Sequence, residues 1–229
     1  MSDYARPKGA GLRRPTPAAS RLIEHQSAPP IASTLWTQAL GSVPSELFLG
    51  QGSMGDARKL EVFECMLQAL ALTGTERVLE VGTGTGYRSA LLAHMAKEVY
   101  TLETSPNAAE LARERHARLG LNNVYVVDAD GSKGFAIGAP YQAILVSGAL
   151  PYVPTELIDQ LDGGGRLVIP VGDDGGQLVE RVRKLPQALE TDTLTWCDLS
   201  SLICEAPPRA SRRPWMRGAS NRAAPSSGR

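Results

Sequence analysis

The sequence predicts an α/β fold in which a mostly parallel sheet is covered by helices on both faces and closed by an antiparallel hairpin at its C-terminal edge. From about residue 74 onward, short apolar runs such as 77–81 and 141–146 alternate with helical stretches. These runs lack the polar alternation of a sheet with one solvated face, so parallel strands between helices are expected. Residues 178–185 and 194–203 do alternate polar and apolar side chains, which predicts the antiparallel pair.

The individual elements follow in order along the chain. Ahead of the sheet we expect helices over 21–26, 31–40 and from Asp56 to about Leu70, where apolar residues recur every three or four positions. The strands expected in the parallel part are 77–81, 98–103, 123–127, 141–146 and 166–171. The helices expected between them are 87–95, 107–119 and 154–160, the last ended by Asp162 and the three glycines that follow.

Charge is segregated along the chain although the formal net charge is zero. The first 21 residues carry five basic residues against one acidic residue, and the last 24 carry six arginines and no acidic residue. We expect disordered basic tails over 1–20 and 206–229. Between them we expect one domain over 21–205, of which 21–60 forms an N-terminal lid or substrate segment. This domain is acidic and suits a nucleic-acid backbone poorly, so no nucleic-acid partner is expected.

Composition excludes several other classes of protein. No apolar run approaches the roughly 20 residues that a membrane-spanning helix needs, and residues 1–20 lack the apolar centre of a secretory signal. Three widely spaced cysteines, without a C-x-x-C pair, exclude a disulfide scaffold and a zinc ribbon and suit a reducing compartment. We therefore expect a cytoplasmic monomer with no membrane partner and no metal.

The most informative motif is the glycine-rich turn after the strand at 77–81. Gly82, Thr83, Gly84 and Gly86 lie in a G-x-G-x-G turn that opens a helix. Glycines let backbone N–H groups approach a ligand closely. About twenty residues on, Glu103 ends the next strand, where a carboxylate can accept hydrogen bonds from both ribose hydroxyls. This succession of strand, turn, helix, strand and acid predicts a ligand that contains adenosine.

Glycine spacing and charge select among such ligands. Dinucleotide sites usually space their glycines G-x-G-x-x-G, and a phosphate-binding loop would need a following Gly-Lys-Ser/Thr, which is absent here. Glu80 precedes the first glycine by two residues; it repels a pyrophosphate but attracts a sulfonium or a cationic amino-acid moiety. We therefore expect S-adenosylmethionine, with a purely structural glycine turn as the alternative. Asp130 and Gly131 end the third strand and can face the adenine amino group, with Asp128 as the competing candidate.

Several longer stretches of the sequence together are specific enough to indicate a resemblance to one protein family. They are residues 39–48, 77–87, 130–135, 139–144, 151–154 and 161–172. Together they resemble the protein-L-isoaspartate O-methyltransferase family, over roughly residues 21–203. The resemblance implies a Rossmann-like, seven-stranded methyltransferase fold with S-adenosylmethionine as donor. It also implies a protein-repair reaction, in which the free carboxylate of an isoaspartyl residue in a damaged peptide is methylated.

The sequence departs from the family pattern on the acceptor side. The family carries a Thr-Ile-Ser-x-Pro-like segment whose serine lies near the transferred methyl. Here a gapped alignment puts Ser53 or Met54 at that serine, a gapless one puts Arg58 there, and no proline follows. Gln142 stands where the family usually has Asp, and residues 147–150 read Ser-Gly-Ala-Leu where the family has Thr and three alanines.

Methyl transfer to a carboxylate needs little acid–base chemistry, because a carboxylate is already ionised at pH 7. The protein has to supply proximity, alignment and exclusion of water. We assign the catalytic position to Ser53, and we expect Gln51, Arg58 and Ser147 to bind the substrate, a peptide or protein with a free carboxylate. Three hypotheses stay open: an isoaspartyl O-methyltransferase, a relative that methylates another peptide or small-molecule acid, and an inactive donor-binding relative.

Overall fold

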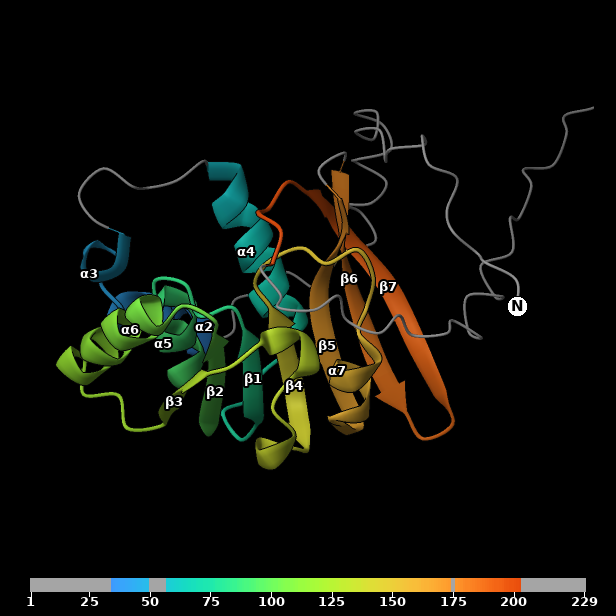
Figure 1. Cartoon of the computed structure of the whole chain (residues 1–229), viewed down its shortest axis with the longest axis horizontal. Helices are drawn as coiled ribbons and strands as arrows, with labels where there is room; N and C mark the ends of the chain where they lie inside the picture. Colours follow the sequence, from blue (N-terminus) through green and yellow to red (C-terminus); the bar gives the residue numbers. More distant parts are fainter. Residues whose placement is uncertain (1–33, 50–56, 174–175, 203–229) are drawn as a thin grey trace, which may run out of the picture.

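The computed structural model describes residues 34–49, 57–173 and 176–202, and its centre is one seven-stranded sheet (Figure 1). The strands are β1 (Arg77–Val81), β2 (Glu98–Glu103), β3 (Val124–Asp128), β4 (Tyr141–Val146), β5 (Leu161–Asp173), β6 (Gly176–Leu185) and β7 (Ala188–Cys197). Their order is β3-β2-β1-β4-β5-β6-β7. The first five pair in parallel, and β5, β6 and β7 pair antiparallel. The predicted sheet, including its antiparallel C-terminal edge, is confirmed.

Helices lie on both faces of this sheet, as the unalternating strands predict. They are α2 (Thr34–Ser42), α3 (Glu46–Leu49), α4 (Ala57–Ala69), α5 (Tyr87–Ala93), α6 (Pro106–Arg118) and α7 (Thr155–Asp159), with 3-10 turns η1 (Gly131–Lys133) and η2 (Ala136–Gly138). Successive residues of a strand point to opposite faces. Val78 of β1 accordingly packs in a cluster with α2, α4 and α5, while its neighbour Leu79 packs in a second cluster with α7.

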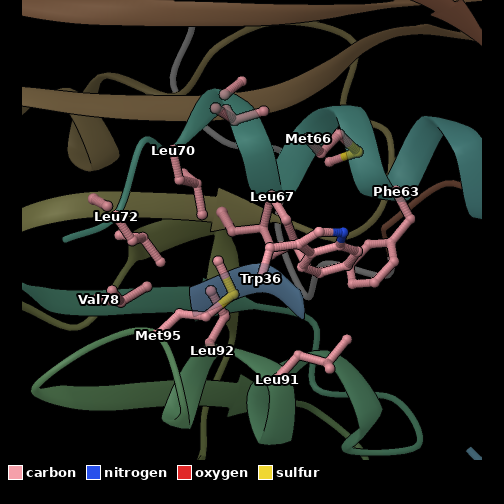
Figure 2. Packing of buried hydrophobic residues seen from close by; sticks show 14 of the residues in the cluster. Trp36, Phe63, Met66, Leu67, Leu70, Leu72, Val78, Leu91, Leu92 and Met95 are labelled. Carbon is pink, nitrogen blue, oxygen red and sulfur yellow. The ribbon is translucent and has the colours of Figure 1, made fainter. Parts of the chain in front are cut away.

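Trp36 joins three helices in the first of these clusters. Its indole lies between Phe63 and Leu67 of α4 on one side and Leu92 of α5 and Met95 on the other (Figure 2). Trp36 is 5% exposed and Leu67 is fully buried. Burial of large apolar side chains of this kind is the main favourable term in folding. Here it fixes α4 against the last turn of α5, the helix that follows the glycine turn.

Two expected strands have different bounds in the structure. β5 begins at Leu161, not at Arg166, because Leu161 already pairs with Tyr141. The register then shifts before Arg166, so the glycine run bulges inside the strand instead of lying ahead of it. The last strand spans Ala188–Cys197, not 194–203. Its first half has few apolar residues, which hid it from the pattern.

The other elements match their expected ranges to within three residues, apart from those outside the described part. The expected helix at 21–26 and both expected tails lie outside the described residues. Among the described residues, no helix has both the length and the apolar character needed to cross a membrane.

Candidate functional site

A cavity of about 340 Å³ lies at the carboxyl ends of the parallel strands. From β1 the chain builds outward to β2 and β3, then crosses back to β4 and β5, so the direction of winding reverses between β1 and β4. Ligands in open α/β sheets bind at such a reversal. The lining residues follow β1, β2, β3 and β4, together with part of α4 and the segment after β7; they are Phe63, Met66, Val81, Gly82, Gly84, Arg88, Leu102, Glu103, Thr104, Ala129, Gly131, Leu145, Ser147, Gly148, Leu199, Ser200, Ser201 and Leu202.

The glycine turn lies against the end of β2. The backbone N–H groups of Gly82 and Thr83 both donate to the Leu102 carbonyl, at 2.9 and 3.1 Å. Gly82, Gly84 and Gly86 all have positive φ, at 93°, 54° and 84°, which side chains disfavour. A Cβ on Gly84 would meet open space, whereas one on Gly86 would press on His116 and Ala112 of α6. Gly82 and Gly84 therefore face the cavity, while Gly86 serves helix packing.

Glu103 ends β2 at the rim of the cavity. One carboxylate oxygen accepts from the N–H of Gly84 (2.8 Å) and the other from the N–H of Ser105 (3.0 Å). A carboxylate oxygen has more than one acceptor position, so both oxygens can still accept further hydrogen bonds. The turn thus orients a carboxylate toward the cavity, at the place where the sequence predicted a ribose ligand.

Glu80 lies beneath the glycine turn and is fully buried. Thr101 Oγ1 donates to one carboxylate oxygen (2.7 Å) and Ser147 Oγ to the other (3.2 Å). Thr83 Oγ1 lies 2.7 Å from Thr101 Oγ1, whose own hydrogen goes to Glu80, so Thr83 donates to Thr101. Burial raises the pKa of Glu80 to about 7, against the opposing effects of Thr101, the charge of Arg88 and Ser147. Glu80 is therefore an ionisable group below the cavity wall that gains its charge near neutral pH, and it is not among the residues that line the cavity.

The two acids near the end of β3 differ in their partners. Asp128 is held by Arg113 at 2.5 Å and its side chain is half exposed. Asp130 Oδ1 accepts from the N–H of Ser132 (3.0 Å), and its buried Oδ2 has no partner among the described residues. A Cβ on Gly131 would overlap a methyl group of Val81, so glycine is required there for η1 to pack against the end of β1. An acceptor is therefore left free at Asp130, not at Asp128.

Ser147, which follows β4, and Arg88 of α5 both line the cavity. Ser147 lines the cavity and its hydroxyl donates to Glu80, while its expected contact with a substrate carboxylate stays a prediction. The Ser147 carbonyl accepts from Arg88 Nη1 at 3.3 Å. Arg88 is the second residue of α5, and the sequence analysis did not single it out, because an arginine on a helix is usually exposed.

The segment after β7 returns over the cavity and forms its outer wall. Gln177, 1% exposed, accepts from the Leu199 N–H (2.8 Å) and donates to the Leu199 carbonyl (2.7 Å). Ala149 then exchanges backbone hydrogen bonds with Ser200 and Leu202, at 3.0 and 2.9 Å. We call residues 199–202 the C-terminal strap. The C-terminal strap was not predicted from the sequence, because a segment that leaves the sheet has no periodic pattern of apolar residues.

The remaining predicted site residues are not placed at the cavity. Ser53 and Gln51 lie outside the described residues. Arg58 is the second residue of α4, in a part of that helix whose side chains are not described. Gln142, one of the departures from the family pattern, lies near the opposite end of the strands, where it bonds the Arg77 N–H and Asp162. The described residues contain no group of His, Cys, Asp and Glu side chains arranged to hold a metal.

Comparisons with known proteins agree on one family. The family model described as protein-L-isoaspartate(D-aspartate) O-methyltransferase matches residues 45–199. A relative from Syntrophobacter fumaroxidans, named protein-L-isoaspartate O-methyltransferase 1, is 37% identical over 171 residues, which are 69% of this chain and 80% of that protein. A protein-L-isoaspartate O-methyltransferase from Myxococcus xanthus is 46% identical over 128 residues, which are 56% of this chain. The match spans 59% of the Myxococcus protein, less than two thirds of its length.

Solved structures show the same fold. A structure titled protein-L-isoaspartate O-methyltransferase superposes with a TM-score of 0.66 at 25% identity, covering 74% of this chain and 61% of that chain. A second, from Plasmodium falciparum, is titled as a putative enzyme of this kind in complex with S-adenosyl-L-homocysteine. It gives a TM-score of 0.63 at 18% identity, covering 80% of this chain and 93% of that chain.

Proposed function

This chain belongs to the protein-L-isoaspartate(D-aspartate) O-methyltransferase family, and on that premise we propose that it transfers a methyl group from S-adenosylmethionine to the free carboxylate of an isoaspartyl residue in a peptide or protein. One observation carries the proposal. The cavity at the strand reversal is lined by a fixed carboxylate, Glu103, which ends β2 and holds the glycine turn, and by a cation, Arg88, which donates to the Ser147 carbonyl after β4. A carboxylate suits the ribose hydroxyls of an adenosyl donor, and a cation suits an anionic acceptor.

The donor end fits S-adenosylmethionine group by group. Glu103, held by two backbone N–H groups, would accept from the ribose hydroxyls. Asp130, whose Oδ2 lacks a partner in the described part of the chain, would accept from the adenine amino group. Gly84, whose Cβ position is open space, leaves room for the amino-acid part, and the buried carboxyl group of Glu80 beneath the turn favours a cationic ligand when it is ionised.

The chain's contribution to the reaction is placement and charge. When bound, S-adenosylmethionine supplies a methyl group on a sulfonium; a carboxylate oxygen takes it, and the C–S electron pair stays on sulfur. No proton has to move, which accords with the absence of a His-based acid–base pair among the described lining residues. The C-terminal strap and Phe63 enclose the cavity with apolar and backbone groups, which keeps water from competing with the acceptor.

A paired-substrate assay tests the proposal. Purified protein is mixed with radiolabelled S-adenosylmethionine and either an isoaspartyl peptide or its normal aspartyl twin. We expect base-labile label on the isoaspartyl peptide alone, because methyl esters hydrolyse in base. Label on the aspartyl twin or on a small-molecule acid instead would assign a different acceptor. Donor binding without transfer to any carboxylate would contradict the enzymatic proposal.

A further inference from the structure

Arg88 is a half-buried cation in the acceptor side of the cavity. Its guanidinium lies over the ring of Phe63, with Cζ 5.1 Å from the ring centroid, and Nη1 donates to the Ser147 carbonyl. Phe63 is itself buried and belongs to the core that anchors α4. An aromatic face on one side and a carbonyl at one nitrogen hold the plane of the guanidinium in a set orientation.

Most of the hydrogen-bonding capacity of this guanidinium is unused by the described residues. An arginine side chain has five N–H donors, and within the described residues the Ser147 carbonyl accepts from one of them. None of the others is a buried donor without a partner, and Arg88 lines the cavity. Burial lowers the pKa of Arg88, with the charge of Glu80 opposing, so the cation bears a desolvation cost that a bound anion would offset.

The other charges at the cavity leave Arg88 as the group suited to an anion. Among the described lining residues Arg88 is the only cation, and Glu103 is an anion at the donor end. Ser147 is the alternative donor, but its hydroxyl already donates to Glu80. We propose that Arg88 binds the acceptor carboxylate by charge-assisted hydrogen bonds and thereby selects acidic acceptors, an inference that rests on the proposed function.

The chemistry of the reaction predicts how the contact between Arg88 and the acceptor carboxylate affects the kinetic constants. Methylation converts a carboxylate into a neutral ester, so the attraction to Arg88 is strongest in the bound substrate and weakens as the charge is lost. An interaction stronger in the ground state than in the transition state lowers KM without raising kcat. Loss of Arg88 should therefore raise KM without lowering kcat, and release of the ester should be easier than release of the substrate.

The test compares carboxylate with amide recognition in Arg88→Gln, Arg88→Lys and Arg115→Gln. Arg115 is the matched control, since it also donates to a backbone carbonyl, that of Thr85 in the glycine turn at 2.8 Å, but does not line the cavity. Calorimetry with S-adenosylhomocysteine bound measures the affinity for an isoaspartyl peptide and for its neutral isoasparaginyl twin. Folding and donor binding are checked by thermal unfolding and by the affinity for S-adenosylhomocysteine alone.

We expect the wild type and Arg115→Gln to prefer the carboxylate peptide by at least about 10-fold, as a charge-assisted pair does. Arg88→Gln should bind both peptides equally, to within about 2-fold, and raise KM by about 30-fold with kcat changed by less than about 3-fold. Arg88→Lys keeps the positive charge but lacks the forked guanidinium group. Its carboxylate preference and its KM should therefore lie between those of the wild type and Arg88→Gln.

Three results would decide against the proposal or separate it from the proposed function. A carboxylate preference that survives in Arg88→Gln overturns it. A matching loss of S-adenosylhomocysteine affinity in Arg88→Gln also overturns it, because Arg88 would then act through Glu80 and the donor end. If the wild type methylates another carboxylate, the isoaspartyl assignment fails, and the same carboxylate–amide comparison on that acceptor still decides the role of Arg88.

Discussion

The two ends of the parallel strands use their polar residues in opposite ways. At the amino ends the polar groups are paired with one another: Arg77 bonds Glu98 at 2.5 Å, and Gln142 bridges the Arg77 N–H and Asp162. At the carboxyl ends the polar groups around the cavity keep free positions, as Asp130 and Arg88 do among the described residues. Saturated polar groups hold the sheet together, and groups with spare capacity are available to a ligand.

Glu76 shows how complete the pairing is at the amino end. Its carboxylate accepts from the N–H groups of Thr73, Gly74 and Thr75 and from the Thr73 hydroxyl, and it meets Arg166 at 3.4 Å. Burial alone would raise the pKa of Glu76, but the bonds from Thr73 and the charge of Arg166 keep it below its usual value. Departures from the family pattern therefore differ in meaning. Gln142 belongs to the paired amino end, whereas we propose that residues near the cavity affect recognition.

Glu103→Ala should have the largest effect on ligand binding. The change removes a carboxylate that the Gly84 and Ser105 N–H groups orient, and with it the proposed ribose contacts. Hydrogen bonds to charged groups contribute roughly 1.5–3 kcal/mol each, so we expect about 100-fold weaker S-adenosylmethionine binding, measured by calorimetry. Asp128→Asn is the matched control, because that acid is engaged by Arg113. Equal losses in both variants would contradict the distinction between free and paired acids.

Gln177→Leu tests the C-terminal strap from outside the cavity. The substitution keeps the approximate size of the side chain but removes both hydrogen bonds to Leu199. We expect kcat/KM for the isoaspartyl peptide to fall about 10-fold because the cavity wall loosens, as happens when positioning groups are lost. Protection of the Leu199 and Leu202 amides in hydrogen exchange should fall in parallel. Reduced activity with unchanged hydrogen exchange at Leu199 and Leu202 would contradict a role of the strap in the loss.

Glu80→Gln tests the buried charge beneath the glycine turn. Because the pKa of Glu80 is raised to about 7, the wild type gains negative charge there as pH rises through neutrality. We expect its S-adenosylmethionine affinity to rise about 5-fold between about pH 6 and 8, relative to Glu80→Gln, as the cationic ligand favours the ionised form. Identical pH profiles in the two proteins would remove Glu80 from the donor site.

The same substitution has a consequence for stability. A raised pKa means that the folded state holds the proton more tightly than the unfolded state, so this contribution is complete below the unfolded pKa and is lost as pH rises through about 7. Thermal unfolding should therefore show a decline in wild-type stability between pH 5 and 8 that is smaller in Glu80→Gln.

Gln142→Ala should have the smallest effect on catalysis. It leaves the Arg77 N–H without its side-chain partner and breaks the link to Asp162. We expect a loss of about 1–2 kcal/mol in unfolding free energy, measured in urea, with KM for both substrates unchanged to within about 2-fold. A change in acceptor KM instead would break the division between the two ends of the sheet.

The parts of the site that the sequence predicted are those encoded locally. The glycine turn and Glu103 follow from a strand, a turn and a second strand within about 27 residues, and the fold class follows from the same rhythm. Arg88 could not be recognised this way, because its partners Phe63 and Ser147 lie 25 residues before it and 59 after it. The burial of Glu80 was likewise hidden, since it depends on Thr101 and Ser147, brought from two other strands.

Because the C-terminal strap follows every strand in the sequence, the cavity wall that it forms is synthesised after the sheet. A Cβ on Gly82 would lie 3.1 Å from the Leu202 side chain, so the first glycine of the turn is walled by a residue that leaves the ribosome 120 residues later. Every strand has by then emerged, and the nascent chain can pair its sheet before the cavity is closed. A chain stalled before residue 199 would carry the glycine turn and Glu103 without the wall that shields them.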